Sequence, residues 1–112
     1  MISTVFGELG SVKFDWDMRT CVCVVITSGG YPENYKTGYP ISGLDSVDTD
    51  TMVFHAGTNL SQNGVVTTSG GRVLTVVTSG EDIYQARTKT YSNVKNLKFI
   101  DSYHRTDIGL IP

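Results

Sequence analysis

The sequence predicts an α+β domain in which a small, mostly antiparallel sheet carries one long helix. Three observations favour this fold class. Residues 21–27 form a run of β-branched and other apolar side chains that is typical of a strand. The pairs at residues 63–64 and 70–71, Asn-Gly and Gly-Gly, are typical of hairpin turns. After residue 79 the apolar side chains recur at helical spacing.

The first strand is expected at residues 21–27, CVCVVIT. Its nearly unbroken apolar character indicates a strand that is covered on both faces. We therefore expect Cys21 and Cys23 to be buried, as free cysteines commonly are. The two thiols are too close in sequence for a good disulfide, and neither His55 nor His104 stands at a zinc-motif spacing from them. No metal site is predicted, and a reducing compartment fits this cysteine usage.

Further strands are expected at residues 51–56, 65–68 and 72–78. Because tight glycine turns separate them, we predict that these strands form an antiparallel meander. Residues 99–103 are expected to form a short closing strand.

The segment between the first two strands, residues 28–50, is punctuated by glycine and proline and is predicted to be a loop. Ile41 and Leu44 are expected to anchor it to the domain. Its acidic stretch, residues 45–50, lacks the glycine and the terminal glutamate of an EF-hand. A solvated acidic loop is therefore predicted rather than a calcium site.

The helix is predicted within residues 80–97 because its apolar side chains recur every three or four residues. The members of this stripe are Ile83, Ala86, Thr90, Val94 and Leu97. Ser79 is predicted to cap the N-terminus, with Asp82 three residues later resembling a capping box. We expect the stripe to cover one face of the sheet.

The length of 112 residues fits one domain, and the formal net charge of −2 supplies no basic field for a nucleic-acid backbone. No apolar run approaches a membrane span, and the N-terminus lacks a signal-peptide pattern, so we expect an intracellular protein. The domain is expected to occupy residues 16–112, with residues 1–15 as the end of a preceding element or a linker. Phe14 and Trp16 are expected to pack on this domain or on a part of the molecule upstream of it.

The sequence contains none of the motifs HExxH, GxSxG or the Walker lysine loop. Three patches remain as candidate sites. In SGGYP, residues 28–32, successive glycines either form a structural turn or aim several backbone N–H groups at an anion. Arg72 is either a surface arginine of its strand or a partner for a carboxylate or phosphate. Arg105 and Asp107 face the same way in an extended segment, where the guanidinium forms an ion pair or holds a phosphate.

These patches belong to a longer series of motifs. In chain order they are SGGYP, GLD, VFHAGT, GGRVL and YHRTDIG, and they lie between Trp16 and Gly109. This series resembles the C-terminal domain of the phosphoribosylamine–glycine ligase family, also called glycinamide ribonucleotide synthetases, which are ATP-grasp enzymes. The agreement of several motifs in one order is far more specific than any single glycine pair. His104, Thr106 and Thr27 depart from the family pattern, in which tyrosine, a basic residue and alanine are usual.

The resemblance implies a cytoplasmic enzyme of de novo purine synthesis. Such a ligase joins glycine to 5-phosphoribosylamine through a glycyl phosphate and converts ATP to ADP and phosphate. ATP and magnesium, or manganese, would be bound by the N-terminal and ATP-grasp domains, which precede this domain in the family. The chain alone is therefore expected to be inactive, and its expected partners are those domains and the small-molecule substrates.

The resemblance also implies roles for particular residues. Arg105 stands at the arginine of the family's YRxDIG motif and is expected to hold the ribose phosphate. Gly29 and Gly30 are expected to let the backbone approach a substrate or a neighbouring domain, with Tyr31 fixing the exit of the loop. Arg72 completes the set of candidate substrate-binding residues.

Two alternatives come from other functional classes. The first is a stand-alone binding or interaction module built on the same domain and without catalysis. The second is a carrier domain, which needs an exposed lysine at a hairpin tip. Because the predicted hairpin tips at residues 63–64 and 70–71 contain no lysine, the sequence does not favour the carrier-domain hypothesis.

Overall fold

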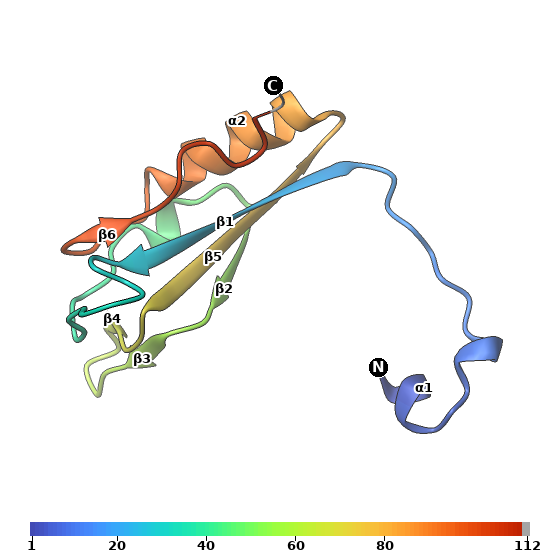
Figure 1. Ribbon diagram of the computed structural model, residues 1–112, viewed down its shortest axis with the longest axis horizontal. Coiled ribbons are helices and arrows are strands. Elements are labelled where there is room, and N and C mark those ends of the chain that lie inside the picture. Colours follow the sequence, from blue (N-terminus) through green and yellow to red (C-terminus); the bar gives the residue numbers. More distant parts are fainter. Residues whose placement is uncertain (111–112) are drawn as a thin grey trace.

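The computed structural model describes residues 1–110 and has the predicted α+β architecture (Figure 1). The long helix lies along one side of a twisted sheet. The strands are β1 (Thr20–Ser28), β2 (Met52–His55), β3 (Thr58–Leu60), β4 (Val66–Thr68), β5 (Arg72–Gly80) and β6 (Ser102–Tyr103). The helices are α1 (Ile2–Val5) and α2 (Ile83–Val94), with short 3-10 turns at η1 (Leu9–Ser11) and η2 (Leu44–Ser46).

The strands form two sheets instead of the predicted meander. The larger sheet has the order β2-β5-β1-β6, and β3 pairs with β4 in a separate two-stranded sheet. The meander prediction is wrong because β5 pairs with β1 on one edge and with β2 on the other, while β4 pairs with β3, so the strands on either side of Gly70-Gly71 do not form a hairpin. The hairpin predicted at residues 63–64 is confirmed, but its first strand, β3, is short and polar and was not predicted. The closing strand predicted at residues 99–103 is also present, but it is shorter and consists of β6.

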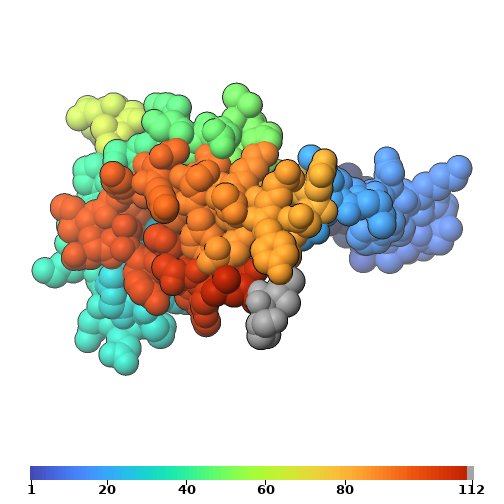
Figure 2. All heavy atoms as spheres, turned by 90° about the horizontal axis from the view of Figure 1, so that it is seen from above, coloured from blue at the N-terminus to red at the C-terminus, as the bar shows by residue number. Residues whose placement is uncertain are grey.

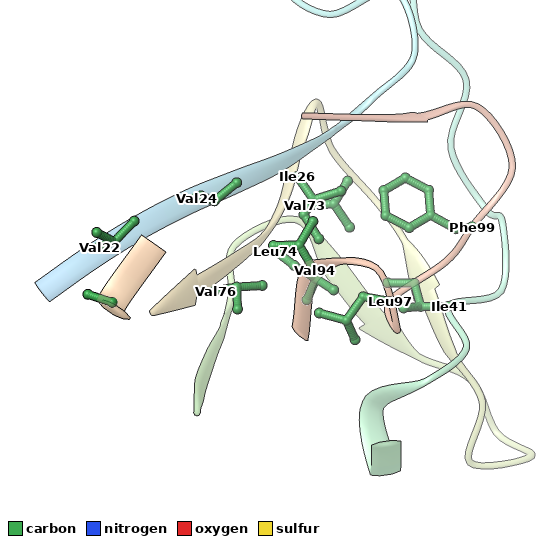
Figure 3. Packing of buried hydrophobic residues seen from close by; sticks show 11 residues of the cluster. Val22, Val24, Ile26, Ile41, Val73, Leu74, Val76, Val94, Leu97 and Phe99 are labelled. Atoms are coloured by element: carbon green, nitrogen blue, oxygen red, sulfur yellow. The ribbon is translucent and has the colours of Figure 1, made fainter. Parts of the chain in front are cut away.

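Strand β1 alternates between a buried and an exposed face. Val22, Val24 and Ile26 are at most 3% exposed and point into the core (Figure 3). Cys21 and Cys23 lie on the other face, exposed and unbonded. The prediction of buried cysteines is therefore wrong, because α2 covers only one face of the sheet and the apolar run does not mark a strand covered on both.

Helix α2 begins later than predicted. The carboxylate of Asp82 accepts a hydrogen bond from the backbone N–H of Gln85 (2.7 Å), so Asp82 is the N-cap. In return the side chain of Gln85 accepts one from the backbone N–H of Glu81 (2.7 Å). Ser79 is not the cap because it is still paired in β5, opposite Cys21. The predicted stripe is confirmed, since Ala86, Thr90 and Val94 are buried, with Leu97 buried just beyond the helix.

The loop before β2 is fastened to α2 by polar contacts. The buried side chain of Asn93 accepts a hydrogen bond from the backbone N–H of Asp48 (2.8 Å) and donates one to its carboxylate (2.9 Å). Ile41 is buried and Leu44 packs against the core, as predicted for anchors of this loop. The carboxylates at Asp45, Asp48 and Asp50 belong to exposed residues, which confirms the solvated acidic loop.

Residues 1–19 extend away from the sheet and helix as an arm that carries α1 and η1 (Figures 1 and 2). Phe14 and Trp16 are 63% and 76% exposed and stack on each other at 6.0 Å between ring centroids. The expectation that they pack on this domain is therefore wrong, and contact with an upstream part stays a prediction. Within residues 1–110, no helix is both long and apolar enough to span a membrane.

Candidate functional site

The three sequence patches meet at one hollow of about 270 Å³. The hollow lies where the exposed face of β1 meets the segment after β6. It is lined by Cys23, Val24, Val25, Thr27, Tyr31, Arg72, Tyr103, His104, Arg105 and Ile108. Tyr31, Arg72 and Arg105 are thus brought together from positions far apart in the sequence. Gly29 and Gly30 instead line an adjoining hollow of about 570 Å³, which shares Tyr31 with the first.

Tyr31 is held in place by the second glycine pair. At the end of β1, the backbone N–H of Ser28 donates to the carbonyl of Gly71 (2.8 Å). The hydroxyl of Ser28 donates to the carbonyl of Gly70 (2.9 Å). The ring of Tyr31 lies directly over Gly71, where an added Cβ would come within 2.1 Å of Cδ2. The two Gly-Gly motifs therefore interlock, and this packing fixes the ring at the edge of the hollow.

Chain packing also accounts for Gly29 and Gly30. A Cβ on Gly29 would lie 2.6 Å from the carbonyl oxygen of Asp101. Gly30 has a φ of +88°, and a Cβ there would lie 2.2 Å from the carbonyl oxygen of Asn34. The structural-turn interpretation of SGGYP thus explains both glycines, and their approach to a substrate stays a prediction.

Arg72 reaches the hollow because of a β-bulge. Ile26 is opposite Leu74, but the next residue, Thr27, is opposite Arg72, so Val73 is the extra residue on β5. In a regular strand Arg72 would share the buried face of Leu74, since side chains two apart point the same way. The bulge turns Arg72 to the open face of the sheet, beside Thr27.

Arg105 forms the ion pair that its spacing from Asp107 predicts. Its Nε donates to Oδ1 (2.9 Å) and its Nη2 to Oδ2 (2.6 Å), a bidentate arrangement. The guanidinium lowers the pKa of Asp107 to about 2, and the carboxylate raises the pKa of Arg105. The pair engages Nε and Nη2, so the N–H groups of Nη1 remain available to a ligand in the hollow.

Two residues of α2 support this segment and were not predicted from the sequence. The hydroxyl of Tyr91 donates to the carbonyl of Arg105 (2.7 Å) and accepts from the backbone N–H of Ile108 (3.1 Å). Arg87 donates to the carbonyls of Thr106 (2.7 Å) and Ile108 (3.1 Å). Their i, i+4 spacing signals a contact between Arg87 and Tyr91 but does not reveal the segment that they bind.

Among residues 1–110 there is no group of three or more His, Cys, Asp or Glu side chains that could hold a metal ion. Two arginines, Arg72 and Arg105, are among the side chains that line the hollow.

A model of the family described as phosphoribosylglycinamide synthetase, C domain, matches residues 21–111. The match covers most of the chain and includes α2 and every residue that lines the hollow. The chain belongs to the phosphoribosylglycinamide synthetase C-domain family. The resemblance drawn from the motif series is thereby confirmed.

Curated relatives of this C domain carry the name phosphoribosylamine–glycine ligase. The relative from Fusobacterium nucleatum is 40% identical over 112 residues, covering 97% of this chain and 26% of its own length. That from Neisseria meningitidis serogroup A is 42% identical over 107 residues, covering 96% of this chain and 25% of its own length. The C domain described here thus spans about a quarter of the length of the curated relatives that it matches.

A solved structure has the same fold. The crystal structure of phosphoribosylamine–glycine ligase from Thermotoga maritima matches with a TM-score of 0.75 and 27% sequence identity. The match covers 95% of this chain and 26% of that one. The C domain therefore has the fold of a part of a ligase that is about four times as long.

Proposed function

We propose that this chain acts as the C-terminal domain of an ATP-dependent ligase that joins glycine to 5-phosphoribosylamine in purine synthesis. The observation that carries the proposal is the hollow at the end of β1, where Tyr31, Arg72 and Arg105 meet in a member of this C-domain family. The full-length relatives that it matches are named phosphoribosylamine–glycine ligases, which supports the assignment.

In this proposal Arg105 holds the ribose phosphate. Asp107 binds the guanidinium through Nε and Nη2 and so orients it, while the N–H groups of Nη1 face the anion. Arg72 supplies a second positive charge from the other side of the hollow, which suits a phosphate dianion better than one guanidinium alone. Tyr31 forms the wall between the hollow and the glycine loop that contains Gly29 and Gly30.

As the family resemblance implies, the proposal assigns ATP and its magnesium or manganese ion to other domains of the ligase. The chain alone then turns over no ATP. Its contribution is to bind the ribosylamine and to close one wall of the site. The reduced thiols of Cys21 and Cys23 fit an enzyme of the cytoplasm.

The open face of the large sheet is the surface on which we propose that the rest of the ligase docks. We define this open face by five exposed residues of β1 and β2: Cys21, Cys23, Val25, Met52 and Phe54. The cross-strand register places them on the same face of the sheet, with Val77 and Thr75 of the intervening strand β5 between the two rows. The open face is apolar and continues into the hollow through Cys23 and Val25, so docking there would place the hollow at a domain boundary.

The decisive experiment is Arg105→Ala in the full-length ligase that carries this chain. We expect the KM for phosphoribosylamine to rise roughly tenfold or more through loss of a charge-assisted contact, while the KM for ATP and for glycine stays unchanged. Arg19→Ala is the matched control, because the Nε and Nη2 of Arg19 form the same bidentate pair with Asp17 two residues away, but Arg19 lies outside the hollow. An unchanged KM for phosphoribosylamine in Arg105→Ala would refute the proposed role.

A further inference from the structure

We propose that Arg87 and Tyr91 of α2 are positioning residues that set the conformation of residues 105–108 and thereby the direction of the Arg105 side chain. The inference deepens the proposed function and rests on it for the role of Arg105. Helix α2 would then orient the site, although its sequence pattern indicates only packing on the sheet.

The hydroxyl of Tyr91 binds both ends of this segment. It donates to the carbonyl of Arg105 (2.7 Å) and accepts from the backbone N–H of Ile108 (3.1 Å), so its proton and a lone pair are both engaged. One oxygen atom thereby fixes the distance between residues 105 and 108. Such a bridge holds the intervening turn closed.

Arg87 binds the middle and the end of the same segment. Its Nη2 donates to the carbonyl of Thr106 (2.7 Å) and its Nε to that of Ile108 (3.1 Å). The planar fork of a guanidinium presents these two donors at a fixed spacing, which a lysine cannot do. The same guanidinium lies 4.7 Å from the centroid of the Tyr91 ring, a cation–π contact that joins the two side chains into one support.

These contacts engage the main chain and leave the Arg105 side chain to face the hollow. Residues 105–108 follow β6 and are not part of a strand, so no sheet hydrogen bonds fix their conformation. The hydrogen bonds from α2 do so instead. The Arg105 side chain is 66% exposed and would otherwise sample many directions. Helix α2 holds the backbone of Arg105, and Asp107 accepts a hydrogen bond from its Nε. The guanidinium is therefore oriented before a phosphate binds, which lowers the entropy cost of binding.

The test is Tyr91→Phe in the full-length ligase, with Tyr84→Phe as the matched control. Phenylalanine keeps the ring that Arg87 contacts and removes only the hydroxyl. Tyr84 is on the same helix, 67% exposed, and its hydroxyl has no hydrogen-bond partner among the described residues.

We expect the Ile108 amide to exchange with deuterium about fivefold faster or more in Tyr91→Phe. We also expect the KM for phosphoribosylamine to rise severalfold while the KM for ATP stays the same. Tyr84→Phe should change neither quantity.

Arg87→Lys is a second variant that keeps the positive charge. Because an ammonium cannot reproduce the fork, we expect it to raise the same KM and to leave the melting temperature within a few degrees of the parent. If Tyr91→Phe changes neither the exchange of Ile108 nor the KM for phosphoribosylamine while Arg105→Ala raises that KM, the positioning inference is overturned and the proposed function stands. If Arg105→Ala leaves the KM unchanged, the proposed function fails, and faster exchange at Ile108 still supports the positioning of the segment.

Discussion

At the level of single residues, the two glycines of the second Gly-Gly motif differ in what surrounds them. An added Cβ on Gly70 would have its nearest neighbour at 3.4 Å, an ordinary contact. The same atom on Gly71 would lie 2.1 Å from Cδ2 of Tyr31 and 3.1 Å from Cγ, near the root of the side chain. The ring cannot avoid this clash by turning at its tip, so Gly71 is required by packing where Gly70 is not.

We predict that Gly71→Ala lowers the free energy of unfolding by about 1–3 kcal/mol, the usual cost of overpacking, and that Gly70→Ala costs less. The two changes add the same atom at adjacent positions, so their difference isolates the contact with Tyr31. Denaturant unfolding of both variants measures it. Equal stabilities would show that the Tyr31 ring is free to leave Gly71.

The ion pair of Arg105 and Asp107 predicts a pH dependence. The pKa of Asp107 is lowered to about 2 by the guanidinium, below the ordinary value of about 3.9. A lowered pKa in the folded state means that the pair stabilises the fold above about pH 4 and that this contribution is lost as the pH falls toward about 2. Since both side chains are more than half exposed, at 66% and 51%, we expect salt to weaken it.

An NMR titration of the carboxyl carbons measures this pKa directly. Arg105→Ala should return the pKa of Asp107 toward its ordinary value and leave unchanged that of Asp17, which Arg19 also lowers to about 2. A parent chain in which Asp107 titrates near pH 4 would contradict the pairing.

At the level of the elements, buried hydroxyl groups join α2 to the sheet. Thr78 of β5 and Thr90 of α2 are both fully buried, with their hydroxyl oxygens 2.7 Å apart. Both hydroxyls lie within hydrogen-bond distance of the carbonyl of Ala86, and that of Thr90 also lies near the carbonyl of Val22 in β1. The apolar stripe on α2 accounts for its burial, and these polar contacts specify how the helix is seated.

We predict that Thr90→Val lowers the free energy of unfolding by about 1–3 kcal/mol, because it removes the buried hydroxyl that bonds to Thr78 and lies near the carbonyl of Val22. The double variant Thr78→Val with Thr90→Val should cost less than the sum of the single changes, since both partners of the shared bond are then removed. Denaturant unfolding of the four proteins forms a double-mutant cycle. Strict additivity would mean that the two hydroxyls do not interact.

At the level of the whole molecule, the sheet is covered on one face only. Helix α2 and the loop before β2 bury Val22, Val24 and Ile26, whereas the open face keeps Phe54 and Met52 more than half exposed. The arm formed by residues 1–19 adds further exposed apolar side chains and makes no core of its own (Figure 2). Apolar surface on this scale is typical of a domain that is completed by contact with a partner.

If the chain is part of the proposed ligase, we predict that Phe54→Glu weakens its docking on the other domains without unfolding this domain. The domain's own free energy of unfolding should change by no more than about 0.5 kcal/mol, as is usual for exposed positions. In the proposed ligase the arm leads from this domain toward the docked part, so its limited proteolysis should become about tenfold faster once the burial of a phenylalanine is lost. Leu60→Glu is the control, because Leu60 is 73% exposed but belongs to the separate β3–β4 sheet. Equal proteolysis of the two variants would refute docking on the open face.

Much of the fold follows from local patterns in the sequence. β1, β5 and α2 are found close to their predicted bounds because side-chain periodicity and the turn residues depend on neighbours along the chain. The motif series also identifies Arg105, Arg72, Tyr31, Gly29 and Gly30 as candidates, and the structure brings Tyr31, Arg72 and Arg105 to one hollow. The support from Arg87 and Tyr91 could not be predicted in this way, since their partners lie more than a dozen residues away on a segment without periodicity.

The amino-acid sequence alone determines the class of the fold, its long helix, its main strands and its family, because these depend on periodicity and on the order of motifs. Only the tertiary structure decides that β5 lies between β1 and β2, that Cys21 and Cys23 face outward, and that a bulge turns Arg72 into the hollow. Strand pairing between distant segments is set by which faces α2 can cover and by where one extra residue enters the ladder. Those choices join contacts that are remote in sequence, and local patterns do not record them.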